Sequence, residues 1–208
     1  MEAPFRVGGA DRVIRLEVAA EIPGRVRRLK WYELGPFTVF DVETTGMSPV
    51  SDRIVELAAV RIDRDGTERE FQTLVNPGRR IPPDVIRVHH ITDEMVSDAP
   101  HFPTAGREFT EFARGSTLVA HNARFDLGFL QESLARCGLE LWKGKTIDTV
   151  RLLRKTHPHL PSYRLQSLRL CFRLPAPEEM QAHRAGSDVR WTLQLLQMAL
   201  EKALASQK

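Results

Sequence analysis

Apolar residues fall into short, dense runs from about residue 35 onwards, and these runs predict the strands of a sheet. The densest run covers residues 37–44 and is rich in β-branched side chains, which indicates a central strand. Asp65 and Gly66 form a hairpin turn signal between two further runs. Four more strands are therefore predicted, at residues 54–62, 70–75, 117–120 and 146–147.

Helical spacing is clearest near the C-terminus, where Val189, Leu193, Leu196 and Leu200 recur three and four residues apart. This spacing predicts a helix over residues 186–204. Shorter helices are expected at residues 104–114, 124–137, 149–155 and 163–172. Because strands come first and then alternate with helices, the order predicts an α/β fold, with a mixed five-stranded sheet and helices on both faces.

Two segments lie outside this regular pattern. Residues 76–103 carry five of the 13 prolines and are expected to be irregular. Residues 1–34 form a predicted N-terminal basic extension, with a short strand at residues 14–18 and a cluster of basic side chains at residues 25–30. We therefore expect two parts, the extension at residues 1–34 and a domain at residues 35–208.

Composition places the chain among ordinary globular proteins. Hydrophobic residues make up 42% of it, and no apolar run approaches the roughly 18 residues that a membrane span needs. The start of the chain lacks the pattern of a signal peptide, so we expect a cytoplasmic protein without a membrane partner. Cys137 and Cys171 stand neither in a CxxC pair nor near a histidine at zinc spacing, so free thiols are expected.

Charge adds little by itself, since the net charge is only +3, but it is unevenly placed. Residues 1–30 hold seven basic and four acidic residues, so the rest of the chain is neutral. If the acidic cluster described next binds cations, the protein becomes more positive than its sequence suggests. A polyanionic substrate would then be favoured.

Two acids stand inside the predicted central strand. Asp41 and Glu43 are two residues apart, so both side chains would point to the same face of the sheet. Such a pair repels at neutral pH unless it shares a proton or binds a cation, and hard oxygen ligands suit Mg²⁺ or Mn²⁺. The alternative, two solvated acids at the end of a strand, remains open from this pair alone.

Two further acids stand at predicted helix starts. Asp126 follows His121 and Asn122, and it falls in the first turn of the helix after the fourth strand. Asp188 falls in the first turn of the last helix, and His183 precedes that helix in a predicted loop. A carboxylate is favoured at either place by the helix dipole alone, so each of these acids also has an ordinary structural interpretation.

Together these residues match three ordered motifs. The first is DxET with the following residues, at residues 41–46; the second is HNxxFD, at residues 121–126; and the third is HxxxxD, at residues 183–188. Residues 76–77 and 91–95 add weaker likenesses. From Phe37 to Leu204 the chain resembles the DnaQ-like exonucleases, in their DEDDh branch, and it is similar to the proofreading epsilon subunit of bacterial DNA polymerase III.

The resemblance implies a ribonuclease H-like fold and a metal-dependent 3′→5′ exonuclease that releases nucleoside 5′-monophosphates from single-stranded DNA. It also implies two divalent cations, Mg²⁺ or Mn²⁺, held by four carboxylates, with His183 as the general base. The four carboxylates are Asp41, Glu43, Asp126 and Asp188. Contacts to the 3′-terminal nucleotide are expected from Thr44, Thr45, Gly46, Met47 and Asn122.

Several alternatives stay open at this stage. An exoribonuclease or oligoribonuclease of the same superfamily would use the same residues and differ in how its pocket treats the 2′-hydroxyl. A catalytically inactive module that binds nucleic acid is a second alternative. A DNA polymerase is a further candidate partner. Asp148 either lies near the site or caps the helix that starts at Thr149.

Overall fold

The computed structural model describes residues 29–175 and 185–206. Five strands form one sheet in the order β3-β2-β1-β4-β5, with β1 (Phe37–Thr44) at its centre. The strands β2 (Ile54–Ile62) and β3 (Glu68–Leu74) continue from β1 as an antiparallel meander. On the other side, β4 (Thr117–Ala120) and β5 (Thr146–Asp148) run parallel to β1. The predicted mixed five-stranded α/β sheet is confirmed.

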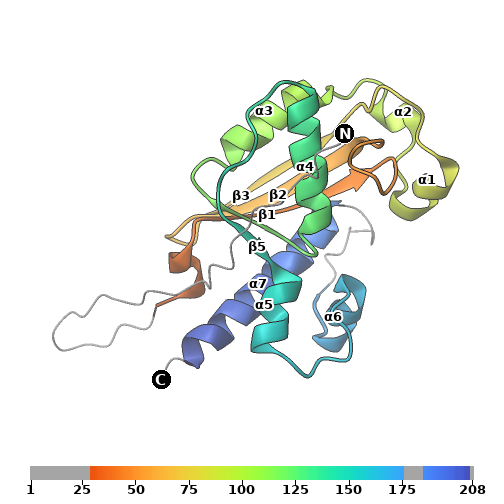
Figure 1. Cartoon of the computed structure of the whole chain (residues 1–208). Coiled ribbons are helices and arrows are strands. Elements are labelled where there is room, and N and C mark those ends of the chain that lie inside the picture. The colour runs from red at the N-terminus through yellow and green to blue at the C-terminus, as the bar shows by residue number, and fades with distance from the viewer. Residues whose placement is uncertain (1–28, 176–184, 207–208) are drawn as a thin grey trace, which may run out of the picture.

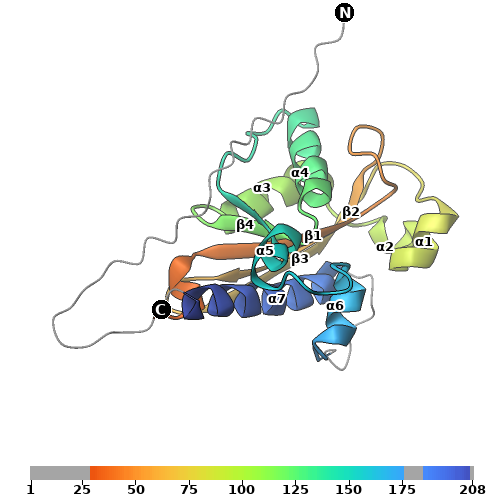
Figure 2. The same ribbon diagram turned by 60° about the horizontal axis from the view of Figure 1, so that its bottom comes forward.

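Helices cover both faces of the sheet (Figure 1). One face packs against α3 (Phe102–Phe112) and α4 (Arg124–Arg136), with Phe40 and Val42 of β1 in the shared core. The opposite face packs against α7 (Ala185–Ala205), which lies along the sheet in Figure 2. Val39 belongs to this second core, so the side chains of β1 alternate between the two layers as the strand period requires.

Two shorter helices complete the layer next to α7. The helix α5 (Thr149–Thr156) follows β5 directly, and α6 (Leu165–Cys171) packs beside α7. Leu153, Leu168 and Leu195 join these three helices in a small apolar cluster. The predicted helices are thus all present, with ends that differ from the predicted bounds by one or two residues.

The prediction that residues 76–103 are irregular is wrong for their middle part. This stretch contains α1 (Pro83–His89) and α2 (Asp93–Val96). Pro83 stands in the first turn of α1, where the missing N–H would have no partner in any case. Thr92 caps α2 by accepting a hydrogen bond from the Met95 N–H. Although proline often breaks a helix, Pro83 therefore marks the start of one here.

The predicted extension at residues 1–34 falls mostly outside the described residues, including its expected strand and most of its basic cluster. Within the described part, Trp31–Leu34 forms a 3₁₀ helix. Trp31 is buried and its ring stacks on that of Phe37, with 6.3 Å between the ring centroids. This short helix therefore packs on the core beneath α7.

Both cysteines are free, as expected. None of the helices within the described ranges combines the length and apolar character that a membrane crossing requires.

Candidate active site

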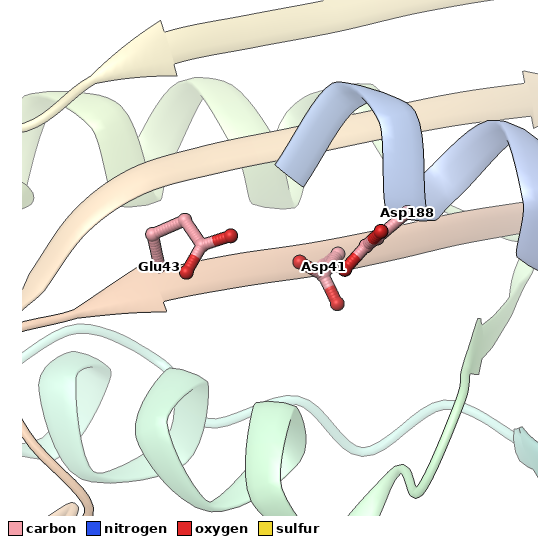
Figure 3. A group of neighbouring side chains, drawn as sticks. All are labelled: Asp41, Glu43 and Asp188. Carbon is pink, nitrogen blue, oxygen red and sulfur yellow. The ribbon is translucent and has the colours of Figure 1, made fainter. Parts of the chain in front are cut away.

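Three carboxylates converge between β1 and the start of α7 (Figure 3). Asp41 and Glu43 lie on β1, and Asp188 lies in the first turn of α7. One oxygen of each side chain lies within 4.8 Å of one oxygen of the other two. The predicted same-face pair on the strand is therefore joined by an acid from the far end of the chain.

The local structure explains why these side chains face α7. The antiparallel register pairs Asp41 with Ala58 and Glu43 with Glu56, and Ala58 packs in the core beneath α7. Both acids share this face with Val39 because residues two apart in a strand point the same way. The register then shifts between Glu43 and Thr44, so the regular pairing of β1 with β2 ends beside the acids.

Asp126 approaches the same region from the N-terminus of α4. It is 2% exposed, and its Oδ1 accepts a hydrogen bond from the Val42 N–H at 3.2 Å. Burial, together with repulsion from Asp188 and Asp148, raises the pKa of Asp126 to about 7, although hydrogen bonds from Val42 and from its own N–H act in the opposite direction. Asp126 therefore belongs electrostatically to the cluster.

Asp41 and Asp188 also have raised pKa values. Burial raises the pKa of Asp41 well above its usual range, and repulsion from Asp126, Asp188 and Glu43 adds to it. Burial also raises the pKa of Asp188 to about 6, opposed by the nearby Arg169 guanidinium. Within the described residues, the buried Oδ1 of Asp188 has no hydrogen-bond partner.

This donor set fits a divalent cation. Three carboxylates that burial and mutual repulsion push towards the neutral form, with Glu43 beside them, are an arrangement that a positive charge stabilises. Oxygen ligands of this kind suit Mg²⁺ or Mn²⁺, and the buried Asp188 Oδ1 offers a lone pair that no other described residue uses. The site is thus an acidic cluster able to hold a metal ion.

The third motif is only partly visible. His183 lies outside the described residues, and α7 begins two positions later at Ala185. The predicted role of His183 therefore remains a prediction.

Residues of the second motif connect the end of β4 to α5 and to the segment before α6. Asn122 adopts a left-handed backbone, φ 64°, which asparagine tolerates better than most residues. His121 is held through Nδ1 by the Thr149 hydroxyl and through Nε2 by the Tyr163 carbonyl, each at 2.8 Å. Burial lowers the pKa of His121, which favours the neutral ring in this structural role.

The end of β1 and the loop after it contain four of the five predicted nucleotide contacts, Thr44 to Met47. Thr44 donates its hydroxyl hydrogen to the Gly46 carbonyl at 2.6 Å, and the Thr45 hydroxyl accepts from the Arg53 N–H at 3.0 Å. A Cβ at Gly46 would stand 2.4 Å from the Asp52 carboxylate, so any larger residue there would have to displace that carboxylate. The Met47 side chain is 80% exposed beside this turn.

Asp148 has the structural role that was one of the two alternatives. Its carboxylate accepts a hydrogen bond from the Val150 N–H at 2.8 Å and caps α5. It is also close enough to Asp126 to raise the pKa of that group. Asp148 thus adds negative charge near the site, while one of its oxygens accepts the hydrogen bond from the Val150 N–H.

The sequence analysis missed one acid, Glu56. This residue is fully buried in β2, directly opposite Glu43, and it adds to the repulsion that raises the pKa of Asp41. A glutamate in the middle of an otherwise apolar strand was the signal that could have identified it.

A cavity of about 690 Å³ lies elsewhere, at the opposite end of β1. Its walls include Leu34 and Lys145, and none of the predicted site residues lines it. The carboxylates of the candidate active site therefore lie outside that cavity.

Comparison with known proteins identifies a family and agrees with the fold. The family model described as Exonuclease, of the RNase T type, matches residues 38–196. The chain is 43% identical over 161 residues to the DNA polymerase III epsilon subunit of Treponema pallidum (strain Nichols), covering 76% of this chain and 74% of that one. It is 40% identical over 169 residues to the PolC-type DNA polymerase III of Bacillus subtilis (strain 168), covering 80% of this chain but only 12% of that polymerase.

Solved structures show a similar arrangement. Exonuclease X in complex with 5′-overhanging duplex DNA is 29% identical with a TM-score of 0.59, over 83% of this chain and 92% of that one. Exonuclease I of E. coli in complex with a dA16 oligonucleotide has a TM-score of 0.65 at 20% identity, over 80% of this chain and 40% of that one. The second likeness concerns the fold alone.

Proposed function

Because the chain belongs to the RNase T-type, DnaQ-like exonuclease family, we propose that it hydrolyses single-stranded DNA from the 3′ end and releases nucleoside 5′-monophosphates. The observation that carries this proposal is the cluster of Asp41, Glu43 and Asp188, with the buried Asp126 beside it. Burying these carboxylates is costly, and a role in metal binding and catalysis would account for their presence at this place.

The four carboxylates would hold two divalent cations, Mg²⁺ or Mn²⁺. When bound, such ions supply Lewis-acid activation of water and neutralise charge on the phosphate. The role of the strand and helix is to hold the carboxylates in place before substrate arrives, because rigid elements preserve the geometry better than loops do.

The proton transfer is assigned to His183. A water oxygen attacks the phosphorus of the terminal phosphodiester, and the bond from phosphorus to the 3′ oxygen of the preceding nucleotide breaks. An imidazole nitrogen of His183 takes the proton of the attacking water, for which its ordinary pKa of about 6.5 is suited. The water oxygen ends on the released 5′-monophosphate, and the leaving 3′ oxygen takes a proton from solvent to become the 3′-hydroxyl of the shortened strand.

The terminal nucleotide would lie against the loop after β1. Thr44 and Thr45 fix the shape of this loop by their hydroxyl contacts, and the exposed Met47 offers an apolar surface for a base. Gly46 allows the close approach that the turn needs, and Asn122 adopts its left-handed backbone in the turn before Asp126.

DNA is the proposed substrate because the similar proteins point to it. One relative is a subunit of DNA polymerase III, and exonuclease X was solved with duplex DNA. The same likeness to a polymerase subunit supports a DNA polymerase as partner. Size-exclusion chromatography with the replicative polymerase of the same organism tests this, and separate elution of the two proteins would contradict it.

Digestion of 5′-labelled single-stranded DNA, beside RNA of the same sequence, tests the proposed activity. With Mg²⁺ or Mn²⁺ we expect a ladder on DNA that shortens from the 3′ end, and with EDTA we expect none. Asp41→Asn serves as the matched inactive control. Faster trimming of RNA would change the substrate to RNA, while absence of cleavage with retained binding would indicate a binding module.

A further inference from the structure

Glu56 is a buried carboxylate that the proposed chemistry does not use. It is 0% exposed in β2 and lies opposite Glu43 in the sheet. An ionisable group so deeply buried needs compensating partners, because the loss of its hydration is costly. Those partners indicate its role.

Both oxygens of Glu56 accept hydrogen bonds from other elements. Oε2 accepts from the backbone N–H of Ala185 at 3.2 Å, and Oε1 accepts from the Gln72 side chain of β3 at 2.9 Å. Because each oxygen is already directed at a donor of the protein, Glu56 is placed to hold an element in position rather than to complete the ligand set.

The element that it holds is α7. Ala185 is the first residue of this helix, and the N–H groups of a first helical turn have no partner within the helix. A carboxylate at this end is also favoured by the helix dipole. Asp188 follows in the same first turn, three positions later, and His183 precedes Ala185 by two positions.

We propose that Glu56 is a positioning residue, which fixes the start of α7 on the sheet and so places Asp188 against Asp41. In this role Glu56 acts on the metal-binding acids through the backbone of α7. The proposal rests on the proposed function in one respect, since it assumes that Asp188 is used to bind a cation.

The packing around the contact supports this role. A Cβ at Gly186 would stand 3.2 Å from the Gln72 side chain, so helix and strand approach closely at this point. One turn further along α7, Arg190 forms ion pairs with Glu68 and Glu70 of β3. The first two turns of α7 are thus attached to neighbouring strands at successive points.

Charge gives a second argument. Glu56 adds to the repulsion on Asp41, so a neutral residue would make the buried cluster less costly. A glutamine would be a weaker, neutral acceptor for the Ala185 N–H, and it would keep its contact with Gln72 only if the Gln72 amide turned over. Only a carboxylate accepts from both donors while Gln72 keeps its present orientation.

The test compares Glu56→Gln with the double variant Glu56→Gln/Gln72→Glu. In the double variant the glutamine accepts from the Ala185 N–H and donates to the new carboxylate, so both of these hydrogen bonds are kept and the pair keeps its net charge. Mn²⁺ binding is measured by titration calorimetry on folded protein without nucleic acid, and kcat and KM on single-stranded DNA follow. Circular dichroism checks that each variant is folded.

We expect Glu56→Gln to weaken Mn²⁺ binding by roughly tenfold and to lower kcat with little change in KM, as residues that orient metal ligands do. The double variant should recover most of both. Wild-type affinity in Glu56→Gln would overturn the proposal, and so would a double variant as impaired as the single one. If Glu56→Gln does not fold, Gln72→Leu takes its place, because Gln72 is exposed and its replacement disturbs the core less. We expect Gln72→Leu to weaken Mn²⁺ binding by less than Glu56→Gln would. Unchanged Mn²⁺ affinity in this variant would overturn the proposal.

Failure of this inference can be told from failure of the proposed function. Wild-type protein that binds no Mn²⁺ and cleaves no DNA would contradict the proposed function. Wild-type protein that binds and cleaves, with Glu56→Gln indistinguishable from it, would contradict only the role of Glu56.

Discussion

Replacing Asp188 by asparagine should stabilise the metal-free protein while abolishing most of its response to metal. The side chain is largely buried, and its Oδ1 has no hydrogen-bond partner within the described residues. Asparagine keeps the shape and removes the charge. The change therefore separates the cost of the charge from the packing of the side chain.

The magnitude follows from the pKa. Burial raises the pKa of Asp188 from 3.8 to about 6, so the folded state keeps this proton to a higher pH than the unfolded chain does. Stability is therefore lost as pH rises from about 4 to about 6, and at pH 8 the loss is about 3 kcal/mol. An asparagine amide without full hydrogen bonding costs about 1–2 kcal/mol of this gain. We expect a net stabilisation of about 1–2 kcal/mol, or about 2–8 °C in Tm for a chain of this size.

The assay is thermal unfolding at pH 8, followed by circular dichroism, in EDTA and in Mn²⁺. In EDTA the variant should melt above the wild type, and at pH 5 this difference should shrink. Mn²⁺ at about 100 times its Kd should stabilise the wild type by about 2.7 kcal/mol and the variant by much less. The order of the two melting temperatures then reverses.

The control is Glu140→Gln, which removes an exposed acid whose ion pair with Lys143 contributes little. It should change neither melting temperature nor metal response. The reasoning is refuted if Asp188→Asn melts no higher than the wild type in EDTA at pH 8, or if Mn²⁺ stabilises both proteins equally.

Three further predictions concern the proposed catalysis and substrate contacts. His183→Ala should lower kcat by about 10²–10⁴-fold with Mn²⁺ affinity unchanged, because it removes a general base and no ligand; calorimetry and steady-state kinetics check this, and normal kcat would contradict it. Gly46→Ala should raise KM for DNA and leave Mn²⁺ binding intact, since its Cβ would displace the Asp52 carboxylate that stands 2.4 Å away; an unchanged KM would show that the loop does not contact substrate. Deleting residues 1–28, which carry six basic residues, should flatten the salt dependence of DNA binding, as measured by fluorescence anisotropy, and an unchanged slope would count against phosphate contacts there.

Elements with strong local patterns could be predicted from the sequence. The bounds of β1, β2 and β4 agree with those predicted, because β-branched and apolar runs identify strands locally. The helices α1 and α2 were missed because a proline-rich stretch lacks helical periodicity, and only the position of Pro83 at a helix start distinguishes it from a breaker. The ends of the predicted helices differ slightly from the observed ends because capping depends on contacts beyond the local pattern.

For the site, too, some features follow from local sequence and others from tertiary packing. The sequence by itself determined that Asp41 and Glu43 share one face, because the strand period of two depends only on neighbouring residues. It also placed Asp126 and Asp188 at helix starts, where local dipoles favour them. Only the tertiary structure decided that α7 starts beside β1 and that Glu56 holds it there across 129 positions of sequence. Contacts over that separation depend on how whole layers pack, because burial of the apolar faces of β1 and α7 brings the acids together despite their mutual repulsion.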